Sequence, residues 1–332
     1  MADIRAPLML LLLAAGAELA PARAEPMLAD FDYPYPVQRF QFQSQGQSLA
    51  MAFMDVPPAQ ANGKTIVLLH GKNFCGATWE SSIGPLREAG FRVVVPDQIG
   101  FCKSSKPQAY QYGLHQLAAN THALLANIGV ERPIVLGHSM GGMLALRYAR
   151  MYAGDLTAVV LVNPIGLEDW KAKGVPFITV DQLYERERQT SFDSIKRYQQ
   201  ATYYAGEWKP AYDRWVKMLA DMYTGDGGKL VAWNQALTSD MILGQPVVHE
   251  LEQITVPTVL MIGQKDTTAI GKDRAPPALA RALGNYAKLG QQAHERIAGS
   301  VLVPFPELGH SPQVQDPAQF NKALLEQLAR WR

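Results

Sequence analysis

The stretch Ile134-Val135-Leu136-Gly137-His138-Ser139-Met140-Gly141-Gly142 joins a short apolar run to a helical segment that continues to Tyr152. The run lacks polar alternation, which is typical of a strand buried on both faces of a parallel sheet. Ser139 lies between two glycines in the pattern G-x-S-x-G, where larger flanking side chains would collide in a tight turn. The stretch therefore predicts a strand, a sharp turn and a helix, with the Ser139 hydroxyl lifted clear of the sheet.

Similar strand patterns lie on both sides of this stretch. Four further apolar runs are Thr65–Leu69, Val93–Val95, Val159–Val162 and Val259–Ile262. Helical stretches are expected near Gly76–Ala89, Leu114–Ile128 and Met140–Tyr152. Alternation of strands and helices predicts an α/β fold with a doubly wound, mostly parallel sheet. Two alternating strands, Val37–Gly46 and Gln47–Val56, precede this pattern, and a strand near Ser300–Phe305 and a helix near Pro317–Trp331 close it.

Residues 164–250 interrupt the pattern, because they contain no buried strand run and are rich in aromatic residues. We expect a mainly helical cap inserted over the carboxyl ends of the strands, where open α/β sheets bind ligands. The core would then comprise residues 25–163 and 251–332. More than half of the cap's aromatic residues are expected to form its own core, and others could line a substrate pocket.

A serine hydroxyl needs a base to become a nucleophile, and the base needs an orienting carboxylate. His310 is the candidate base, because it lies in a Gly/Pro-marked loop between the last strand and the last helix. Asp266 directly follows the strand Val259–Ile262 and is the favoured carboxylate. Glu168 and Asp169, which follow the preceding strand, are alternatives.

An oxyanion hole is expected from main-chain donors. Leu69-His70-Gly71-Lys72 ends the first parallel strand, so the N–H groups of Lys72 and Met140 form the expected pair. We interpret His70 and His138 as residues that support these loops rather than as second bases.

The first residues predict an export signal. Leu8–Ala17 is an apolar run, and Ala22-Arg23-Ala24 fits a small-x-small cleavage site. Residues 1–24 are therefore expected to be removed, with export to the periplasm or the medium. An uncleaved anchor and an apolar terminus without a targeting role are the alternatives. The apolar run is shorter than the roughly 20 residues that span a bilayer, so no stable membrane insertion is expected.

Cys75 and Cys102 are the two cysteines of the chain. They follow two strands expected to be neighbours, at the same end of the sheet. In an exported protein this placement permits a disulfide, whereas two buried free thiols are the alternative.

Taken together, the residues His70-Gly71, Pro96–Ser104, Gly137–Gly142, Asp266 and Gly309-His310 resemble the α/β-hydrolase superfamily over residues 37–331. The chain is similar to the group with a helical cap between the sixth and seventh strands, which includes esterases, lactonases, carbon–carbon bond hydrolases and epoxide hydrolases. Haloalkane dehalogenases and epoxide hydrolases of this group use an aspartate nucleophile, so Ser139 argues against those two chemistries. Asn73 replaces a proline found in many members, and Cys102 replaces a frequent glycine.

The resemblance and the triad imply acyl transfer to water, with a small or medium ester or lactone that has an apolar part as substrate. Hydrolysis of a carbon–carbon bond in a diketone by the same triad, or a non-catalytic binding protein on this fold, are the alternatives. No metal or organic cofactor is implied, because the sequence has no His/Cys cluster at ligand spacing and no glycine-rich phosphate loop. A net charge of +1 argues against nucleic-acid binding.

Overall fold

The computed structural model describes residues 28–225 and 227–331. An eight-stranded sheet has the order β1-β2-β4-β3-β5-β6-β7-β8. The strands are β1 (Val37–Ser44), β2 (Gln47–Val56), β3 (Thr65–Leu69), β4 (Arg92–Pro96), β5 (Ile134–His138), β6 (Ala158–Val162), β7 (Thr258–Gly263) and β8 (Val301–Phe305). β1–β2 and β2–β4 pair antiparallel, and the other neighbours pair parallel. The predicted doubly wound α/β sheet is confirmed.

Alternate residues of each central strand belong to two separate cores, because successive side chains of a strand point to opposite faces. On one face Val67 and Leu69 pack in the core that includes α2 (Leu114–Asn127), α3 (Met140–Met151) and α9 (Tyr286–Arg296). On the other face, Ile66 and Leu68 pack in the core of α1 (Glu80–Glu88) and α11 (Pro317–Leu328). This two-sided burial explains why the parallel strands read as unbroken apolar runs.

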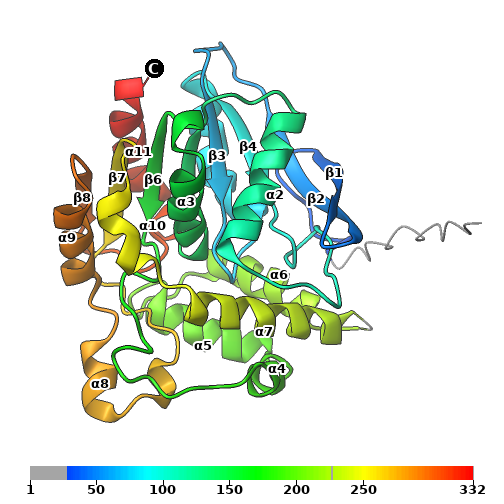
Figure 1. Ribbon diagram of the computed structural model, residues 1–332, viewed down its shortest axis with the longest axis vertical. Helices are drawn as coiled ribbons and strands as arrows, with labels where there is room; N and C mark the ends of the chain where they lie inside the picture. Colours follow the sequence, from blue (N-terminus) through cyan, green and yellow to red (C-terminus); the bar gives the residue numbers. More distant parts are fainter. Residues whose placement is uncertain (1–27, 226, 332) are drawn as a thin grey trace, which may run out of the picture.

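Four helices lie between β6 and β7 and extend across one end of the sheet (Figure 1). They are α4 (Val180–Glu187), α5 (Phe192–Thr202), α6 (Asp213–Met222) and α7 (Gly228–Gly244). We call these helices and their connections the cap; its outer limits at residues 164 and 250 stay a prediction. Part of its core is aromatic, since the rings of Tyr204 and Tyr212 stack with centroids 3.9 Å apart.

The segment between β7 and β8 contains helices that the sequence analysis did not predict, α8 (Pro277–Ala282) and α9. A further short helix, α10 (Pro312–Gln315), precedes α11. The predicted export signal, residues 1–24, lies outside the described residues. Within the described part of the chain, none of the helices is both long and apolar enough to cross a membrane.

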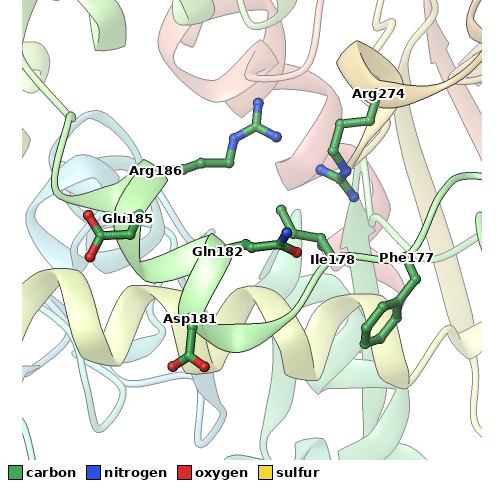
Figure 2. A pocket seen from close by; sticks show the side chains of 7 residues that line it. All are labelled: Phe177, Ile178, Asp181, Gln182, Glu185, Arg186 and Arg274. Carbon is green, nitrogen blue, oxygen red and sulfur yellow. The ribbon is translucent and has the colours of Figure 1, made fainter.

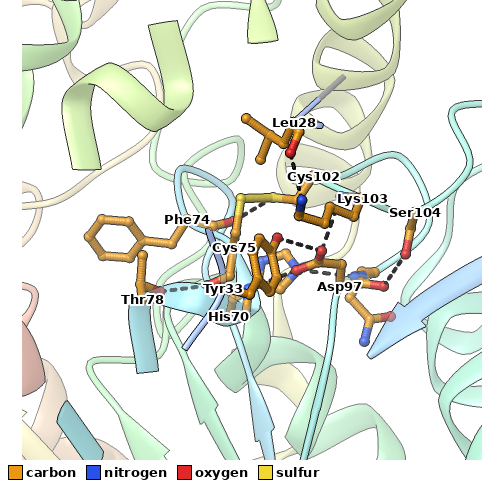
Figure 3. Close-up of a disulfide and its surroundings, with 12 residues drawn as sticks. Leu28, Tyr33, His70, Phe74, Cys75, Thr78, Asp97, Cys102, Lys103 and Ser104 are labelled. Atoms are coloured by element: carbon orange, nitrogen blue, oxygen red, sulfur yellow. Dashed lines mark hydrogen bonds between the residues drawn. A yellow bond between two sulfur atoms is a disulfide. The ribbon is translucent and has the colours of Figure 1, made fainter. Parts of the chain in front are cut away.

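A disulfide joins Cys75 and Cys102, with their Cα atoms 5.8 Å apart (Figure 3). Cys75 follows β3 and Cys102 follows β4, and these parallel neighbours end at the same edge of the sheet. Cys102 has a φ of +47°, in the left-handed region that favours glycine, which explains the glycine frequent in similar proteins at this position. Asp97 supports both sides of the bridge, accepting hydrogen bonds from the N–H of Gly76 (2.7 Å) and of Lys103 (3.0 Å).

Loss of this disulfide is expected to destabilise the fold. The bridged residues are 27 positions apart, and the chain-entropy model assigns such a loop about 3–4 kcal/mol. The variant Cys75→Ala/Cys102→Ala should therefore unfold at a clearly lower urea concentration than the unreduced parent, and the reduced parent should behave like the variant. Two reactive thiols in the denatured, unreduced parent would contradict the bridge.

Lys106 introduces a pH-dependent contribution to stability. Its ammonium group is buried and donates hydrogen bonds to the carbonyl oxygens of Cys102 and Ser104. Burial lowers the pKa of Lys106 from 10.5 to about 7. Between these pH values the unfolded chain binds a proton that the folded chain lacks, so the free energy of unfolding rises with pH, by up to about 1.4 kcal/mol per unit.

The variant Lys106→Met removes this dependence. The free energy of unfolding in urea is measured for the parent and the variant at pH 6, 7.5 and 9. The difference between them reports the contribution of Lys106, because the two proteins share all other titrating groups. Between pH 7.5 and 9, the free energy of unfolding of the parent should rise by at least about 1 kcal/mol relative to that of the variant. Below pH 7 the difference between the two should change little. A difference that does not vary with pH would show that Lys106 keeps its proton in the folded protein.

Candidate active site

Ser139 occupies a strained turn between β5 and α3. Its φ of 57° and ψ of −118° lie outside the regions that L-residues ordinarily adopt. The turn requires its glycines: a Cβ on Gly137 would lie 2.0 Å from the carbonyl oxygen of Gly141, and a Cβ on Gly141 would lie 2.4 Å from that of Leu69. The backbone thus presents the Ser139 hydroxyl at the carboxyl edge of the sheet, as the sequence pattern predicted.

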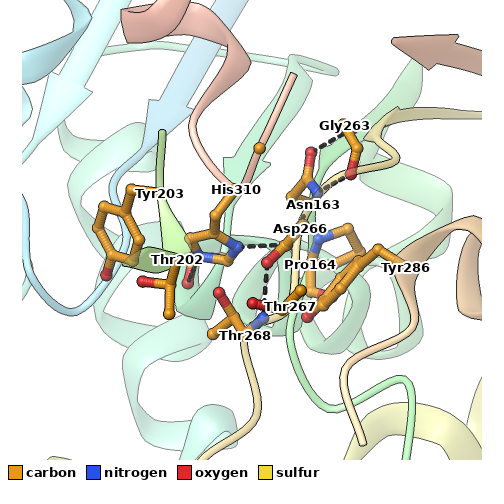
Figure 4. A network of polar contacts seen from close by, with 12 residues as sticks. Asn163, Pro164, Thr202, Tyr203, Gly263, Asp266, Thr267, Thr268, Tyr286 and His310 are labelled. Atoms are coloured by element: carbon orange, nitrogen blue, oxygen red, sulfur yellow. Dashed lines mark hydrogen bonds and ion pairs between the residues drawn. The ribbon is translucent and has the colours of Figure 1, made fainter. Parts of the chain in front are cut away.

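Ser139, His310 and Asp266 form one continuous hydrogen-bonded chain. The Asp266 carboxylate can only accept, so His310 Nδ1 donates to Asp266 Oδ2 over 2.6 Å (Figure 4). His310 Nε2 then accepts from Ser139 Oγ over 2.9 Å. The three side chains are almost fully buried, with exposed fractions of 4% for Ser139, 0% for His310 and 1% for Asp266. The structure therefore brings together the three residues that the sequence analysis selected from separate loops.

Asn163 fixes the orientation of the Asp266 carboxylate, and the sequence analysis missed it. Its Nδ2 donates to Asp266 Oδ2 (2.9 Å) and to the Gly263 carbonyl (3.1 Å), as Figure 4 shows, and its Oδ1 accepts from the Gly263 N–H (2.8 Å). The N–H of Thr268 donates to the other carboxylate oxygen of Asp266 (2.8 Å). An Asn-Pro pair directly after a buried strand, at 163–164, was the available signal.

The alternative carboxylates have other partners. Glu168 accepts hydrogen bonds from Trp170 Nε1 (3.0 Å) and the Gly284 N–H (2.8 Å). Asp169 accepts from the N–H of Ala172 (3.0 Å) and contacts His249 Nε2 (3.0 Å). Neither is hydrogen-bonded to His310, whereas Asp266 is.

A tight turn over residues 71–74 lies against the nucleophile. Gly71 approaches so closely that an added Cβ would lie 2.9 Å from the Cβ of Ser139. The N–H of Phe74 donates to the carbonyl of Gly71 (3.1 Å), which places Lys72 and Asn73 at the two central positions. We call this segment the Gly71–Phe74 turn.

The two N–H groups expected to form an oxyanion hole are both available. Among the residues that the structure describes, the Lys72 N–H has no hydrogen-bond acceptor. Met140 is the first residue of α3, so its N–H has no acceptor within the helix. The helix N-terminus adds a partial positive charge next to Ser139.

Two other buried histidines are structural. The N–H of Gln98 donates to His70 Nε2 (3.0 Å), so His70 Nδ1 carries the proton and donates to the Gly71 carbonyl (2.8 Å). His138 Nε2 donates to the His310 carbonyl (2.9 Å). Burial lowers the pKa of His70, and burial together with the proximity of His310 lowers the pKa of His138 well below its usual value. Both are therefore neutral near pH 7 and place no positive charge beside His310.

Cys75, Asp97 and Cys102 are the group of potential metal ligands found among the described residues. The two sulfur atoms are bonded to each other, whereas a cysteine binds a metal ion as a free thiolate. This group therefore does not fit a metal ion while the disulfide is intact.

A separate hollow of about 480 Å³ is lined by residues of α4, by Phe177 and Ile178 before it and by Arg274 (Figure 2). Its walls carry both charges, from Asp181, Glu185, Arg186 and Arg274, and the exposed ring of Phe177 forms one edge. None of the residues in the Ser139–His310–Asp266 chain lines it.

Comparison with known proteins agrees with this geometry. A model described as "Alpha/beta hydrolase family" matches residues 66–323. The chain belongs to the α/β-hydrolase family. A solved structure of a probable hydrolytic enzyme from Pseudomonas aeruginosa is 61% identical, covers 90% of this chain and 96% of its own, and superposes with a TM-score of 0.89.

More distant relatives act on several kinds of bond. An esterase from Exiguobacterium antarcticum is 22% identical, with 88% of this chain and 100% of its own covered and a TM-score of 0.70, so it supports the fold alone. A 2-hydroxy-6-oxo-6-phenylhexa-2,4-dienoate hydrolase of Comamonas testosteroni is 30% identical over 41% of this chain and 48% of its own. The chain spans between about a third and a half of the length of the curated relatives it matches.

Proposed function

We propose that this α/β hydrolase is a serine hydrolase that cleaves a small or medium ester or lactone through an acyl-enzyme. The observation that carries the proposal is the hydrogen-bonded chain from Asp266 through His310 to Ser139, at distances of 2.6 and 2.9 Å. A serine hydrogen-bonded to an imidazole that a buried carboxylate orients is the arrangement that generates a nucleophile for acyl transfer.

In the first half of the reaction, Ser139 Oγ attacks the substrate carbonyl while His310 Nε2 takes the hydroxyl proton. Asp266 holds the imidazole in the tautomer that can accept this proton and stabilises the imidazolium that forms. The N–H groups of Lys72 and Met140 receive the negative charge of the tetrahedral intermediate. His310 then passes the proton to the leaving alcohol, and an ester of Ser139 remains.

In the second half, His310 removes a proton from water as the water attacks the acyl group. The same two N–H groups stabilise the second tetrahedral intermediate. Its collapse returns the proton to Ser139 Oγ and releases the carboxylic acid. Each atom of the site returns to its starting state.

Aromatic side chains beside His310 support a substrate with an apolar part. The ring centroid of Tyr203, from the cap, lies 4.8 Å from that of His310, and the ring of Phe74 lies 5.5 Å from that of Tyr203. Tyr198 lies 5.5 Å from Tyr203 and is 37% exposed. Phe74 and Tyr203 are themselves buried, so Tyr198 is the ring of this cluster that offers exposed apolar surface on the cap side of His310.

A panel of p-nitrophenyl esters from acetyl to octanoyl, simple γ- and δ-lactones and matched amides tests the proposal. We expect turnover of at least one ester or lactone class and slower turnover of amides. A folded protein that turns over no ester and no lactone would contradict it.

Carbon–carbon bond hydrolysis is the second candidate, because the Comamonas relative is named as a dienoate hydrolase. The same Ser139, His310 and Asp266 would serve it. Adding a 2-hydroxy-6-oxo-dienoate to the panel separates the two activities: turnover of this compound in preference to every ester and lactone would favour the second candidate. A non-catalytic binding protein would turn over none of them.

We also propose that residues 1–24 direct export to the periplasm or the medium and are then removed. The apolar run Leu8–Ala17, the Ala22-Arg23-Ala24 sequence and a disulfide between Cys75 and Cys102 support this. Expression of the full chain in a Gram-negative host, followed by N-terminal sequencing, is expected to give an exported product beginning at Glu25. A cell-associated product that retains Met1 would contradict export with cleavage.

A further inference from the structure

The Gly71–Phe74 turn is anchored on two sides by different means. At its base, Gly71 packs on Ser139, and the disulfide at Cys75 ties the following residue to the β4 loop. At its tip, the side chains of Lys72 and Asn73 leave the core and contact the cap. The backbone that carries the Lys72 N–H therefore depends on cap residues as well as on the sheet.

The first contact to the cap is an ion pair between Lys72 and Glu187. Lys72 Nζ lies 2.7 Å from Glu187 Oε1, and the two side chains are only 13% and 16% exposed. The hydroxyl of Tyr223 donates to the other oxygen, Glu187 Oε2, over 2.6 Å. Glu187 is the last residue of α4 and Tyr223 follows α6, so one carboxylate joins two cap helices to the turn.

The second contact is made by the neighbouring residue of the turn. Asn73 Nδ2 donates to the hydroxyl of Tyr203 over 3.0 Å. Tyr203 follows α5, and its ring also packs against His310 at a centroid distance of 4.8 Å. In addition, the N–H of Ser311 donates to the Tyr203 carbonyl (3.3 Å), so the end of α5 contacts both the histidine loop and the turn.

From this arrangement we propose that Glu187 and Tyr203 are positioning residues that hold the Lys72 N–H in place as an oxyanion donor. The inference rests on the proposed acyl transfer, because only that chemistry needs a donor at this place. Displacement of this donor destabilises the transition state more than the bound substrate, because oxyanion charge develops only as the carbonyl is attacked. The cap therefore completes the catalytic site as well as covering it.

The test uses the second-order rate of inactivation by a fluorophosphonate, which requires no knowledge of the natural substrate. Removal of one oxyanion donor typically costs about 10²–10³ in rate, and we expect loosening of the turn to cost about tenfold. Glu187→Ala and Lys72→Met should each react about tenfold more slowly than the parent, and Lys72→Met keeps the peptide N–H itself. The double variant should lose no more than either single variant, because the two side chains act through one contact.

Two further variants separate positioning from general stability. Glu187→Gln keeps an acceptor oxygen for Lys72 and should react within about threefold of the parent. Arg186→Gln is the matched control. Arg186 precedes Glu187 on α4 and pairs with Asp273 at the surface, where both side chains are about half exposed, so this variant should react at the parent rate. Tyr203→Phe keeps the ring against His310 and should lose several-fold through the Asn73 contact alone.

An alkyl trifluoromethyl ketone provides the readout that a purely structural role would not change. Its tetrahedral hemiketal adduct with Ser139 places an oxyanion within reach of the Lys72 N–H. In Glu187→Ala and Lys72→Met the inhibition constant of the ketone should therefore rise by the same factor as the labelling rate falls. Folded Glu187→Ala and Lys72→Met that label and bind the ketone like the parent would overturn the inference while leaving the serine hydrolase proposal intact. A parent that does not label would instead contradict the proposed function itself.

Discussion

Replacing Ser139 with alanine is expected to lower kcat/KM for the best ester of the panel by about 10⁴–10⁶, to the residual rate that the oxyanion hole and substrate binding supply. Ser139 Oγ is the nucleophile in the proposed mechanism, and among the described residues His310 is its side-chain hydrogen-bond partner. The Cβ remains, so the strained turn and its glycine contacts should persist. The measurement is steady-state kinetics on protein whose melting temperature equals that of the parent.

Ser311→Ala is the matched control for this variant. Ser311 is also fully buried and lies next to His310 in the chain. Its removal should change kcat/KM by no more than a few-fold. Equal losses in the two variants would show that the region tolerates no change, and a Ser139→Ala enzyme with appreciable activity would contradict a covalent serine mechanism.

Asp266→Asn is expected to lower kcat by on the order of 10⁴ near neutral pH, with KM changed far less. An amide at this position can donate to His310 Nδ1, which moves the imidazole proton to Nε2 and leaves no acceptor for the Ser139 hydroxyl. The amide nitrogen then occupies the Oδ2 position and loses the contact from Asn163 Nδ2, whereas the Thr268 N–H can still donate to the remaining oxygen and should keep the loop in place.

Asp169→Asn tests the alternative carboxylate directly. Asp169 interacts with Ala172 and His249 rather than with His310, so this variant should retain activity within a few-fold. A large loss in Asp169→Asn with near-normal kinetics in Asp266→Asn would reverse the assignment of the acid.

The fold and the three residues of the hydrogen-bonded chain were predictable because their signals are local. Buried parallel strands appear as short apolar runs, and G-x-S-x-G requires a particular turn whose glycines the structure shows to be crowded by backbone atoms. Asp266 and His310 each directly follow a predicted strand, and parallel strands deliver such loops to one edge of a sheet. Their places along the chain therefore made them the favoured candidates, although Glu168 and Asp169 remained alternatives to Asp266 until the structure showed the contact to His310.

The contacts between the cap and the site were not predictable in this way. Lys72 and Glu187 are 115 residues apart, and Asn73 and Tyr203 are 130 apart. Nothing in the sequence near Glu187 distinguishes it from the other charged residues of an amphipathic helix. Similarly, the helices α8 and α10 have only six and four residues, which is too short for a helical pattern to be recognised in the sequence.

The central claim is that His310 and Asp266 activate Ser139, and covalent labelling tests it most directly. Parent protein is treated with a fluorophosphonate, digested, and analysed by mass spectrometry beside Ser139→Ala and His310→Ala. The account predicts one adduct per parent molecule, located on the peptide that contains Ser139, none in Ser139→Ala, and a rate at least 10³-fold lower in His310→Ala. A folded parent without an adduct on Ser139, or labelling that His310→Ala leaves unchanged, would contradict it.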